Sequence, residues 1–200
     1  EHAQALVTAQ AAEKIYRSAG EDAVIEINLA AEAGSWLEFL PQETILFEGA
    51  RLRRNTHINV AAGGKLFAGE MMVFGRLGHG ERFSTGLAHD GWEVSRDDRL
   101  AWAEALHLEH DIAEVIDDAA CFDGAVAAAT AVYVGEDAET HLATAREILE
   151  AQHSNTLSGA TFVNGILVMR WLGKDAFDLR NDFGSFWGAF RNQVADLPLA

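Results

Sequence analysis

The chain has 200 residues, which predicts one globular domain or at most two small ones. About half of the residues are hydrophobic, under a quarter are charged and only two are proline, which excludes a disordered or fibrous chain. Fifteen basic against 31 acidic residues give a formal net charge of −16, which argues against nucleic acid or anionic lipid as a partner. The single cysteine, Cys121, excludes an internal disulfide framework and a multi-cysteine zinc site.

No segment of the sequence predicts export or a membrane anchor. The uncharged run at 124–135 is too short to cross a bilayer. No stretch resembles a signal peptide, so a cytoplasmic location is expected. The chain begins at Glu1 rather than at a methionine and enters an alternating segment at once, which suggests a piece of a longer protein.

The first half of the chain predicts β-strands. Between Ala50 and Val60 apolar and polar residues alternate with a period of two, which is typical of a strand with one buried face. Arg54 breaks this pattern, because the register points its side chain to the apolar side, where it needs a carboxylate or carbonyl partner. Alternation on both sides of the Asp97-Asp98 turn predicts a hairpin further along the chain.

An internal echo with a spacing of about thirty residues predicts stacked β-coils. The segment Ile27–Ala31 leads through a glycine to Glu43, and the similar segment Ile58–Ala62 leads through two glycines to Glu70. Chance similarity between alanine-rich strands is the alternative explanation. If the echo reflects stacked coils, Glu43 and Glu70 are equivalent positions on adjacent layers.

The second half of the chain predicts strands alternating with helices. The alanine- and valine-rich run Ala125–Val134 is bounded by glycines, which favours a buried strand. Glu136–Gln152 has apolar residues at helical spacing, and Thr161–Trp171 predicts another strand. A last helix is expected from about Asp175 to Val194. The predicted fold class is therefore mainly β, with β-helix-like stacked sheets and a few helices in the C-terminal half.

Four aromatic residues lie along one side of the last predicted helix: Phe183, Phe186, Trp187 and Phe190. Core packing is the simpler explanation of this aromatic stripe. An exposed stripe would be a docking site for another protein, because patches this apolar rarely stay bare on monomers.

Common nucleotide-binding and hydrolase motifs are missing from the sequence. Gly165–Lys174 has the wrong spacing for a P-loop and lacks a Ser or Thr for magnesium. Gly75–Gly80 has the wrong glycine order for a dinucleotide-binding turn, and is better described as a turn that presents Arg76, His79 and Glu81. Neither a Gly-x-Ser-x-Gly nor a His-Glu-x-x-His segment is present.

Two groups of residues could bind a divalent ion. His107, Glu109 and Asp111 alternate onto one strand face, which makes them a candidate ligand set. His79 with the nearby Glu81 is a second candidate. Hydrated surface residues are the commoner explanation of both patterns.

Glu43 and Glu70 each stand beside an apolar stretch. A carboxylate that is partly buried there must pair with a base or shift its pKa. Pairing with Arg54 or Arg76 for structural reasons is one interpretation. The other is a polar path or an acid pair inside an otherwise apolar β-stack.

Four segments, in this order, resemble the urease accessory protein UreD (UreH) family: Thr8–Ser18, Leu37–Ile45, Glu70–Glu81 and Gly159–Gly173. The second of them is similar to the family's Leu-Glu-Trp-Leu-Pro-Gln-Glu-Thr-Ile signature, with Phe39 in place of the tryptophan. The resemblance implies a single UreD-like domain over 1–200, incomplete at its N-terminus, β-rich over 1–134 and mixed over 135–200. Family members continue upstream through further strands, and a sheet edge left open there would need a partner.

The resemblance implies a maturation factor that is not itself an enzyme. UreD-like proteins bind apo-urease and a UreF-type partner, which recruits a UreG-type GTPase that carries nickel. GTP chemistry then belongs to the UreG-type protein, which agrees with the missing P-loop. No tightly bound cofactor and no nucleic-acid or membrane partner is expected, and any contact with nickel would be transient.

The resemblance also implies a nickel route along which acids pass the ion by weak, exchangeable contacts. The candidates for this route are Glu43, Glu70, Glu81 and His79, with Arg76 as their charge partner. The aromatic stripe becomes a candidate contact with a partner protein. No residue is expected to be catalytic.

Two alternatives come from other functional classes. A hydrolase could use Glu43 and Glu70 as an acid–base pair, if the two carboxyls approach each other and one has a raised pKa. A plain β-rich interaction module would have no metal role, and its Glu43→Ala and Glu70→Ala variants would leave urease activation intact.

Overall fold

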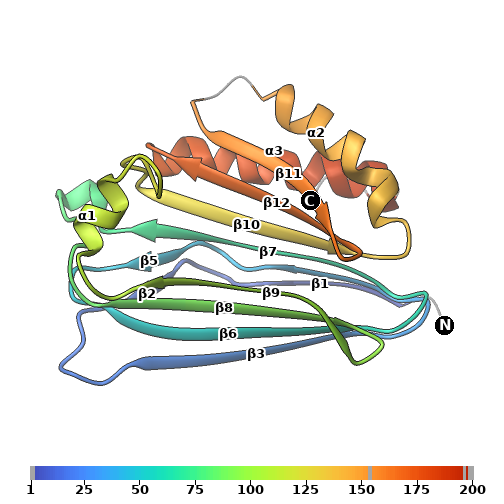
Figure 1. The fold of residues 1–200 in the computed structure, drawn as a ribbon, viewed down its shortest axis with the longest axis horizontal. Helices are drawn as coiled ribbons and strands as arrows, with labels where there is room; N and C mark the ends of the chain where they lie inside the picture. The colour runs from blue at the N-terminus through green and yellow to red at the C-terminus, as the bar shows by residue number, and fades with distance from the viewer. Residues whose placement is uncertain (1–2, 153–154, 196, 198–200) are drawn as a thin grey trace.

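The chain folds into two stacked β-sheets with helices on the outer face of the larger sheet (Figure 1). The structure is a computed structural model and describes residues 3–152, 155–195 and 197. The larger sheet has the strand order β1-β4-β7-β10-β12-β11, with β5 pairing β7 and β2 pairing β5. Its strands are β1 (Gln4–Thr8), β2 (Glu13–Ile15), β4 (Trp36–Leu40), β5 (Thr44–Leu46), β7 (Lys65–Phe74), β10 (Ala127–Val134), β11 (Leu157–Val163) and β12 (Ile166–Gly173).

The smaller sheet has the order β3-β6-β8-β9. Its strands are β3 (Ala23–Ala31), β6 (Arg51–Val60), β8 (Leu87–Arg96) and β9 (Arg99–Leu108). The helices are α1 (Ile112–Asp117), α2 (Leu142–Glu150) and α3 (Ala176–Ala195), with short 3₁₀ turns η1 (Leu77–His79) and η2 (Ala138–His141). The fold is mainly β, as predicted. Among the described residues no helix is both long and apolar enough to cross a membrane.

Parallel pairing in both sheets confirms the predicted stacked coils. β3, β6 and β8 pair in parallel in one sheet, and β1, β4 and β7 do so in the other. The step between partners is 29 residues from β3 to β6 and from β4 to β7, and it is longer, at 32 and 36 residues, from β1 to β4 and from β6 to β8. The echo matched Ile27 with Ile58, whereas the structure pairs Leu29 with Ile58. A slip of two residues keeps every side chain on the same face, so the repeat was visible although its register was wrong.

The predicted equivalence of Glu43 and Glu70 is also wrong. β5 begins at Thr44, which pairs with Met72, so the register puts Glu43 opposite Met71, one position away from equivalence with Glu70 and on the other face. Arg180 of α3 bonds Glu43, whereas Arg54 of the smaller sheet pairs with Glu70. The two carboxyls therefore lie on opposite sides of the larger sheet, and they cannot form the acid–base pair of a hydrolase.

Two turns are set by residues with positive φ. Asp97 and Asp98, at φ 49° and 58°, connect β8 to β9 and confirm the predicted hairpin. Asn164 and Gly165, at φ 50° and 86°, connect β11 to β12. The single strand predicted over 161–171 is thus wrong, because the Asn-Gly pair turns the chain back on itself.

The helix α3 closes the outer face of the larger sheet. Asp175 accepts hydrogen bonds from the backbone N–H groups of Phe177 and Asp178, at 2.8 and 3.0 Å, and so caps the first turn. The aromatic stripe is buried, as the core-packing interpretation expects, and the ring of Trp187 stacks on that of Phe67 with centroids 3.6 Å apart. The stripe is therefore not a free surface in this structure.

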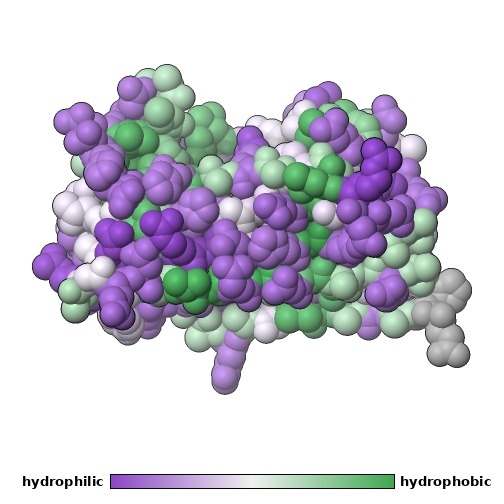
Figure 2. All heavy atoms as spheres, turned by 60° about the horizontal axis from the view of Figure 1, so that its bottom comes forward, coloured by the Kyte–Doolittle hydropathy of each residue, from purple (hydrophilic) through white to green (hydrophobic). Residues whose placement is uncertain are grey.

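The interior between the two sheets has two apolar clusters. One cluster includes Leu52 and Met72, and the other includes Ile58 and Leu66. The outer face of the smaller sheet is largely hydrophilic in its middle (Figure 2), because the polar residues of β6 alternate with its buried ones. What separates the two apolar clusters is a row of polar side chains, which forms the candidate site.

Candidate functional site

The central strands carry polar residues at one or two of their inward-facing positions. In β6, Arg54 and Thr56 stand between Leu52 of one apolar cluster and Ile58 of the other. The same alternation places further polar residues at this level of the interior. Together they form the interior polar row, which consists of Arg54, Glu70, Asp90, Glu104, Thr130 and Arg170.

Arg54 is the centre of the row and is only 2% exposed. Its Nε and Nη2 donate to the two carboxylate oxygens of Asp90, at 2.8 and 2.9 Å, in a bidentate pair. Its Nη2 also contacts the carboxyl of Glu70, and its Nη1 donates to Thr44 Oγ1 at 2.9 Å. The prediction that Arg54 needs a carboxylate partner is confirmed, and it has two.

Arg54, Glu70 and Asp90 form a buried acid cluster with two carboxyls and one guanidinium. Burial is the largest cause that raises the pKa of Glu70 well above its usual range; the charge of Asp90 adds to it and Arg54 opposes it. Burial also acts to raise the pKa of Asp90, but hydrogen bonds from Glu70 and Arg54 outweigh it and hold this pKa below its usual value. The raised pKa favours the protonated form of Glu70, in which the charges of Asp90 and Arg54 balance.

The Glu70 carboxyl is fixed by a third neighbour. Trp92 Nε1 donates to Glu70 Oε1 at 2.8 Å. Next to Arg54 along β6, the buried hydroxyl of Thr56 has no hydrogen-bond partner among the residues that the structure describes. An unpaired buried oxygen is uncommon, because leaving one unsatisfied has a free-energy cost.

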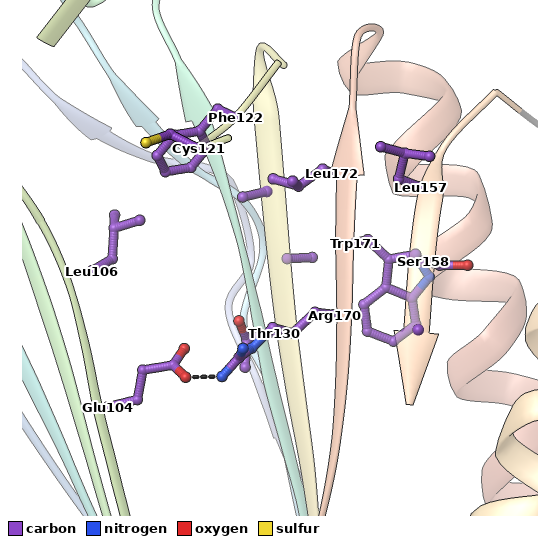
Figure 3. A pocket seen from close by; sticks show the side chains of 13 residues that line it. Glu104, Leu106, Cys121, Phe122, Thr130, Leu157, Ser158, Arg170, Trp171 and Leu172 are labelled. Carbon is purple, nitrogen blue, oxygen red and sulfur yellow. Dashed lines mark ion pairs between the residues drawn. The ribbon is translucent and has the colours of Figure 1, made fainter. Parts of the chain in front are cut away.

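The interior polar row reaches the surface at both ends. At one end the half-exposed Glu13 lies 3.8 Å from Arg54 Nη1. At the other end Thr130, the register partner of Glu70, is followed by Arg170, which pairs with Glu104 across the gap between the sheets. Figure 3 shows Glu104, Thr130 and Arg170 in an open cleft that is lined mostly by apolar side chains. The volume of this cleft is about 360 Å³.

A second buried ion pair lies on the other side of the larger sheet. Glu38 in β4 is 1% exposed and accepts hydrogen bonds from Arg191, Trp36 and Trp187. Burial acts to raise the pKa of Glu38, but these hydrogen bonds, with Arg191 first, hold it below its usual range. The sequence analysis missed this pair, although a charged residue between Leu37 and Phe39 in a predicted strand was its signal.

Three of the predicted site residues meet at one place. Glu43, Arg76 and His79 line a cleft of about 360 Å³ beside the start of α3, together with Phe177 and Arg180; we call it the α3 cleft. Arg180 Nη1 bonds Glu43 at 3.3 Å. Glu70, another predicted candidate for the nickel route, lies on the opposite face of the larger sheet.

Glu81 braces the loop that carries Arg76. It accepts hydrogen bonds from the backbone N–H of Glu48 at 2.6 Å and from Arg76 Nη2 at 2.7 Å. The hydrogen bond from the Glu48 backbone is the main cause that lowers the pKa of Glu81. Arg76 thus forms an ion pair with Glu81. Glu48, which the sequence analysis did not single out, in turn bonds Ser84 and Thr85.

The predicted ligand set of His107, Glu109 and Asp111 is not assembled. His107 Nε2 and Glu109 Oε2 are 3.6 Å apart, but Asp111 stands just before α1 with its backbone in a left-handed conformation. Within the described part of the chain no three or more His, Cys, Asp or Glu side chains are grouped so as to hold a metal ion.

Stacked parallel coils, a helix-covered outer face and a buried acid cluster define a protein of the β-helical class. The family model described as UreD urease accessory protein matches residues 1–200, and the chain therefore belongs to this family. It is 45% identical over 196 residues to the urease accessory protein UreD of Magnetococcus marinus, covering 96% of this chain and 68% of that protein.

Two further relatives carry the same name. The protein of Xanthobacter autotrophicus is 43% identical over 192 residues, covering 96% of this chain and 65% of the relative. The protein of Azorhizobium caulinodans is 40% identical over 196 residues, covering 98% and 71%. The chain thus spans about two thirds of the length of these curated relatives.

Proposed function

We propose that this chain is part of a urease maturation factor that binds apo-urease and supports the insertion of nickel into its active site. The observation that carries this proposal is the family match over the whole chain, together with relatives named as urease accessory proteins. A UreF-type accessory protein is the proposed second partner, and a UreG-type GTPase joins through it. The chain itself acts without catalysis.

The interior polar row supports a role in the passage of the ion. Nickel is the cargo here, and carboxylate, hydroxyl and imidazole groups are donors that divalent ions exchange readily. The row offers such oxygens from Glu13 at one surface through Glu70 and Asp90 to Glu104 at the other. An arriving cation would displace the proton of Glu70 and pair with both carboxyls, because ligands must be deprotonated to bind a metal.

The α3 cleft supports a second role in the same function. Glu43 and His79 are its carboxylate and imidazole, and Phe177 is its most exposed apolar side chain, at 71%. We place either ion transfer or partner contact there. Glu81 and Arg76 hold the loop at the rim, and their role in this proposal is to keep the cleft in shape.

The two alternatives predict different results. A hydrolase based on Glu43 and Glu70 does not fit, since these carboxyls face opposite sides of the sheet. A plain interaction module remains the rival hypothesis, and it requires that urease activation survive the loss of Glu70.

The experiment is complementation in cells that carry a urease operon with its own copy of this gene deleted. The full-length gene is returned intact, as Glu70→Ala, or as Glu43→Ala, and urease activity is measured together with co-purification of apo-urease. We expect the intact gene to restore activity, and Glu70→Ala to bind apo-urease without restoring activity. The matched control is Glu150→Ala, which removes an exposed carboxylate from α2.

The outcomes separate the hypotheses. Full rescue by Glu70→Ala would leave a scaffold whose acids are structural. Failure of the intact gene to restore any activity would contradict the proposed function itself.

A further inference from the structure

Two histidines face each other on the outer surface of the smaller sheet. His89 in β8 and His107 in β9 are direct cross-strand partners, and both point away from the interior polar row. Their neighbours Ala88, Asp90 and Leu108 are buried, which fixes the alternation and therefore the outward direction of both rings.

The two rings are arranged with their nitrogens converging. The Nδ1 atoms are 3.3 Å apart, and the ring centroids are separated by 5.5 Å. Two imidazole nitrogens bound to one tetrahedral ion at about 2.05 Å would stand about 3.3 Å apart. The spacing of the two nitrogens therefore already suits a shared ion.

The surroundings of the pair fit a metal site in two respects. The carboxylate of Glu109 lies 3.6 Å from His107 Nε2, the nitrogen that would not bind the ion, which is where outer-shell carboxylates orient ligating histidines. Beside His89, Gly91 has no side chain, and the surface there forms a groove of about 420 Å³. Gly91 lies on the Nε2 side of His89, so the groove leaves that side of the ring open.

We propose that His89 and His107 form a surface site for a late first-row divalent cation such as Ni²⁺ or Zn²⁺, with water as the remaining ligands. Imidazole is a good ligand for these ions, whereas Mg²⁺ and Ca²⁺ prefer oxygen. With two protein ligands the site binds its ion reversibly and exchanges it with the solvent. It is separate from the interior polar row and does not depend on the proposed function.

The experiment is calorimetric titration of the metal-free, full-length protein with NiCl₂ and, separately, with ZnCl₂ and MgCl₂. The variants are His89→Asn and His107→Asn, and His110→Asn is the matched control because this exposed histidine lies just beyond β9. We expect one Ni²⁺ or Zn²⁺ site that each of the two variants weakens at least ~10-fold. The control is expected to match the wild type, and Mg²⁺ is expected to give no saturable binding at this site.

A second readout keeps the test independent of other weak sites. Because the ion holds β8 and β9 together, a hundredfold excess over its dissociation constant should raise the melting midpoint by roughly 5 °C. This shift should fall to about half or less in both variants at the same metal concentration, while their midpoints without metal stay close to the wild-type value. Unchanged Ni²⁺ affinity in His89→Asn and His107→Asn, or an equal loss in His110→Asn, would overturn the proposal.

Discussion

The position of one proton in the buried acid cluster determines how the stability of this protein should depend on pH. Glu70→Gln replaces a protonated carboxyl by a group of the same shape. The amide oxygen of glutamine can still accept from Trp92 Nε1, and its NH2 group, which can donate to Asp90, takes the place of the Oε2 atom that contacts Arg54. We therefore expect the variant to fold and to keep the packing around the cluster.

The magnitude follows from proton linkage. Folded Glu70 keeps a proton that the unfolded chain releases above the ordinary pKa of 4.5. The stability due to this group is fully present below that pH, and is lost as the pH rises toward the raised pKa, by about 1.4 kcal/mol per pH unit. Glutamine has no such proton to release. The free energy of unfolding of the variant minus that of the wild type should thus increase with pH at this rate.

The assay is urea unfolding of the full-length protein at about pH 5.5, 6.5 and 7.5. Other titrating groups contribute equally to both proteins, so they cancel in the difference. Glu150→Gln, the same chemical change at an exposed position of α2, should give a difference that does not vary with pH. A flat difference for Glu70→Gln would refute the reasoning, because it would mean that Glu70 is ionised in the folded protein.

Three further changes test the packing around the two ion pairs. Arg54→Met leaves Asp90 buried without its counter-charge, so we expect the free energy of unfolding, measured in urea, to fall by about 3–5 kcal/mol. A fall below about 1 kcal/mol would contradict this expectation. Glu38→Gln should destabilise most near neutral pH, and the difference should shrink as the pH falls through the lowered pKa of Glu38, as thermal unfolding across pH would show. Gly69→Ala places a methyl group 2.8 Å from Trp187 Cζ3 and should lower the free energy of unfolding, measured by calorimetry, by about 1–3 kcal/mol. An unchanged free energy of unfolding would show that α3 can shift.

The sequence was a good guide wherever one local pattern decides the structure. Alternation between Ala50 and Val60 predicted β6 almost to the residue, and it identified Arg54 as an inward-facing charge. Helical spacing predicted α3 within one residue at each end. These features depend only on neighbours along the chain, so a single sequence contains them.

Features that depend on distant segments were missed or misplaced. The register between coils could not be read from the echo, because a shift of two residues preserves the inward and outward pattern. The motif around Glu81 did not show that its Oε1 accepts a hydrogen bond from the backbone N–H of Glu48, 33 residues away, and Glu81 stays a candidate for the nickel route. Glu43 and Glu70 had similar local surroundings, and only the three-dimensional structure puts α3 beside one and the smaller sheet beside the other.

The interior polar row had a signal that could have been found. Glu70, Asp90 and Thr130 are each a single polar residue among the inward-facing apolar positions of a strand. One such residue is an exception that a local ion pair explains. Several at the same level of stacked strands indicate a shared site, which becomes visible once the strands are aligned.

The most direct test of the central claim is the nickel content of urease matured with each version of the protein. Urease is purified from the deletion cells carrying the intact full-length gene, Glu70→Gln or the control Glu150→Gln, and nickel is measured per active site by atomic absorption. We predict full occupancy with the intact gene and the control. With Glu70→Gln we predict urease that is largely free of nickel, although the variant is folded and still co-purifies with apo-urease. Full nickel occupancy with Glu70→Gln would contradict the claim that the buried acid cluster takes part in the transfer.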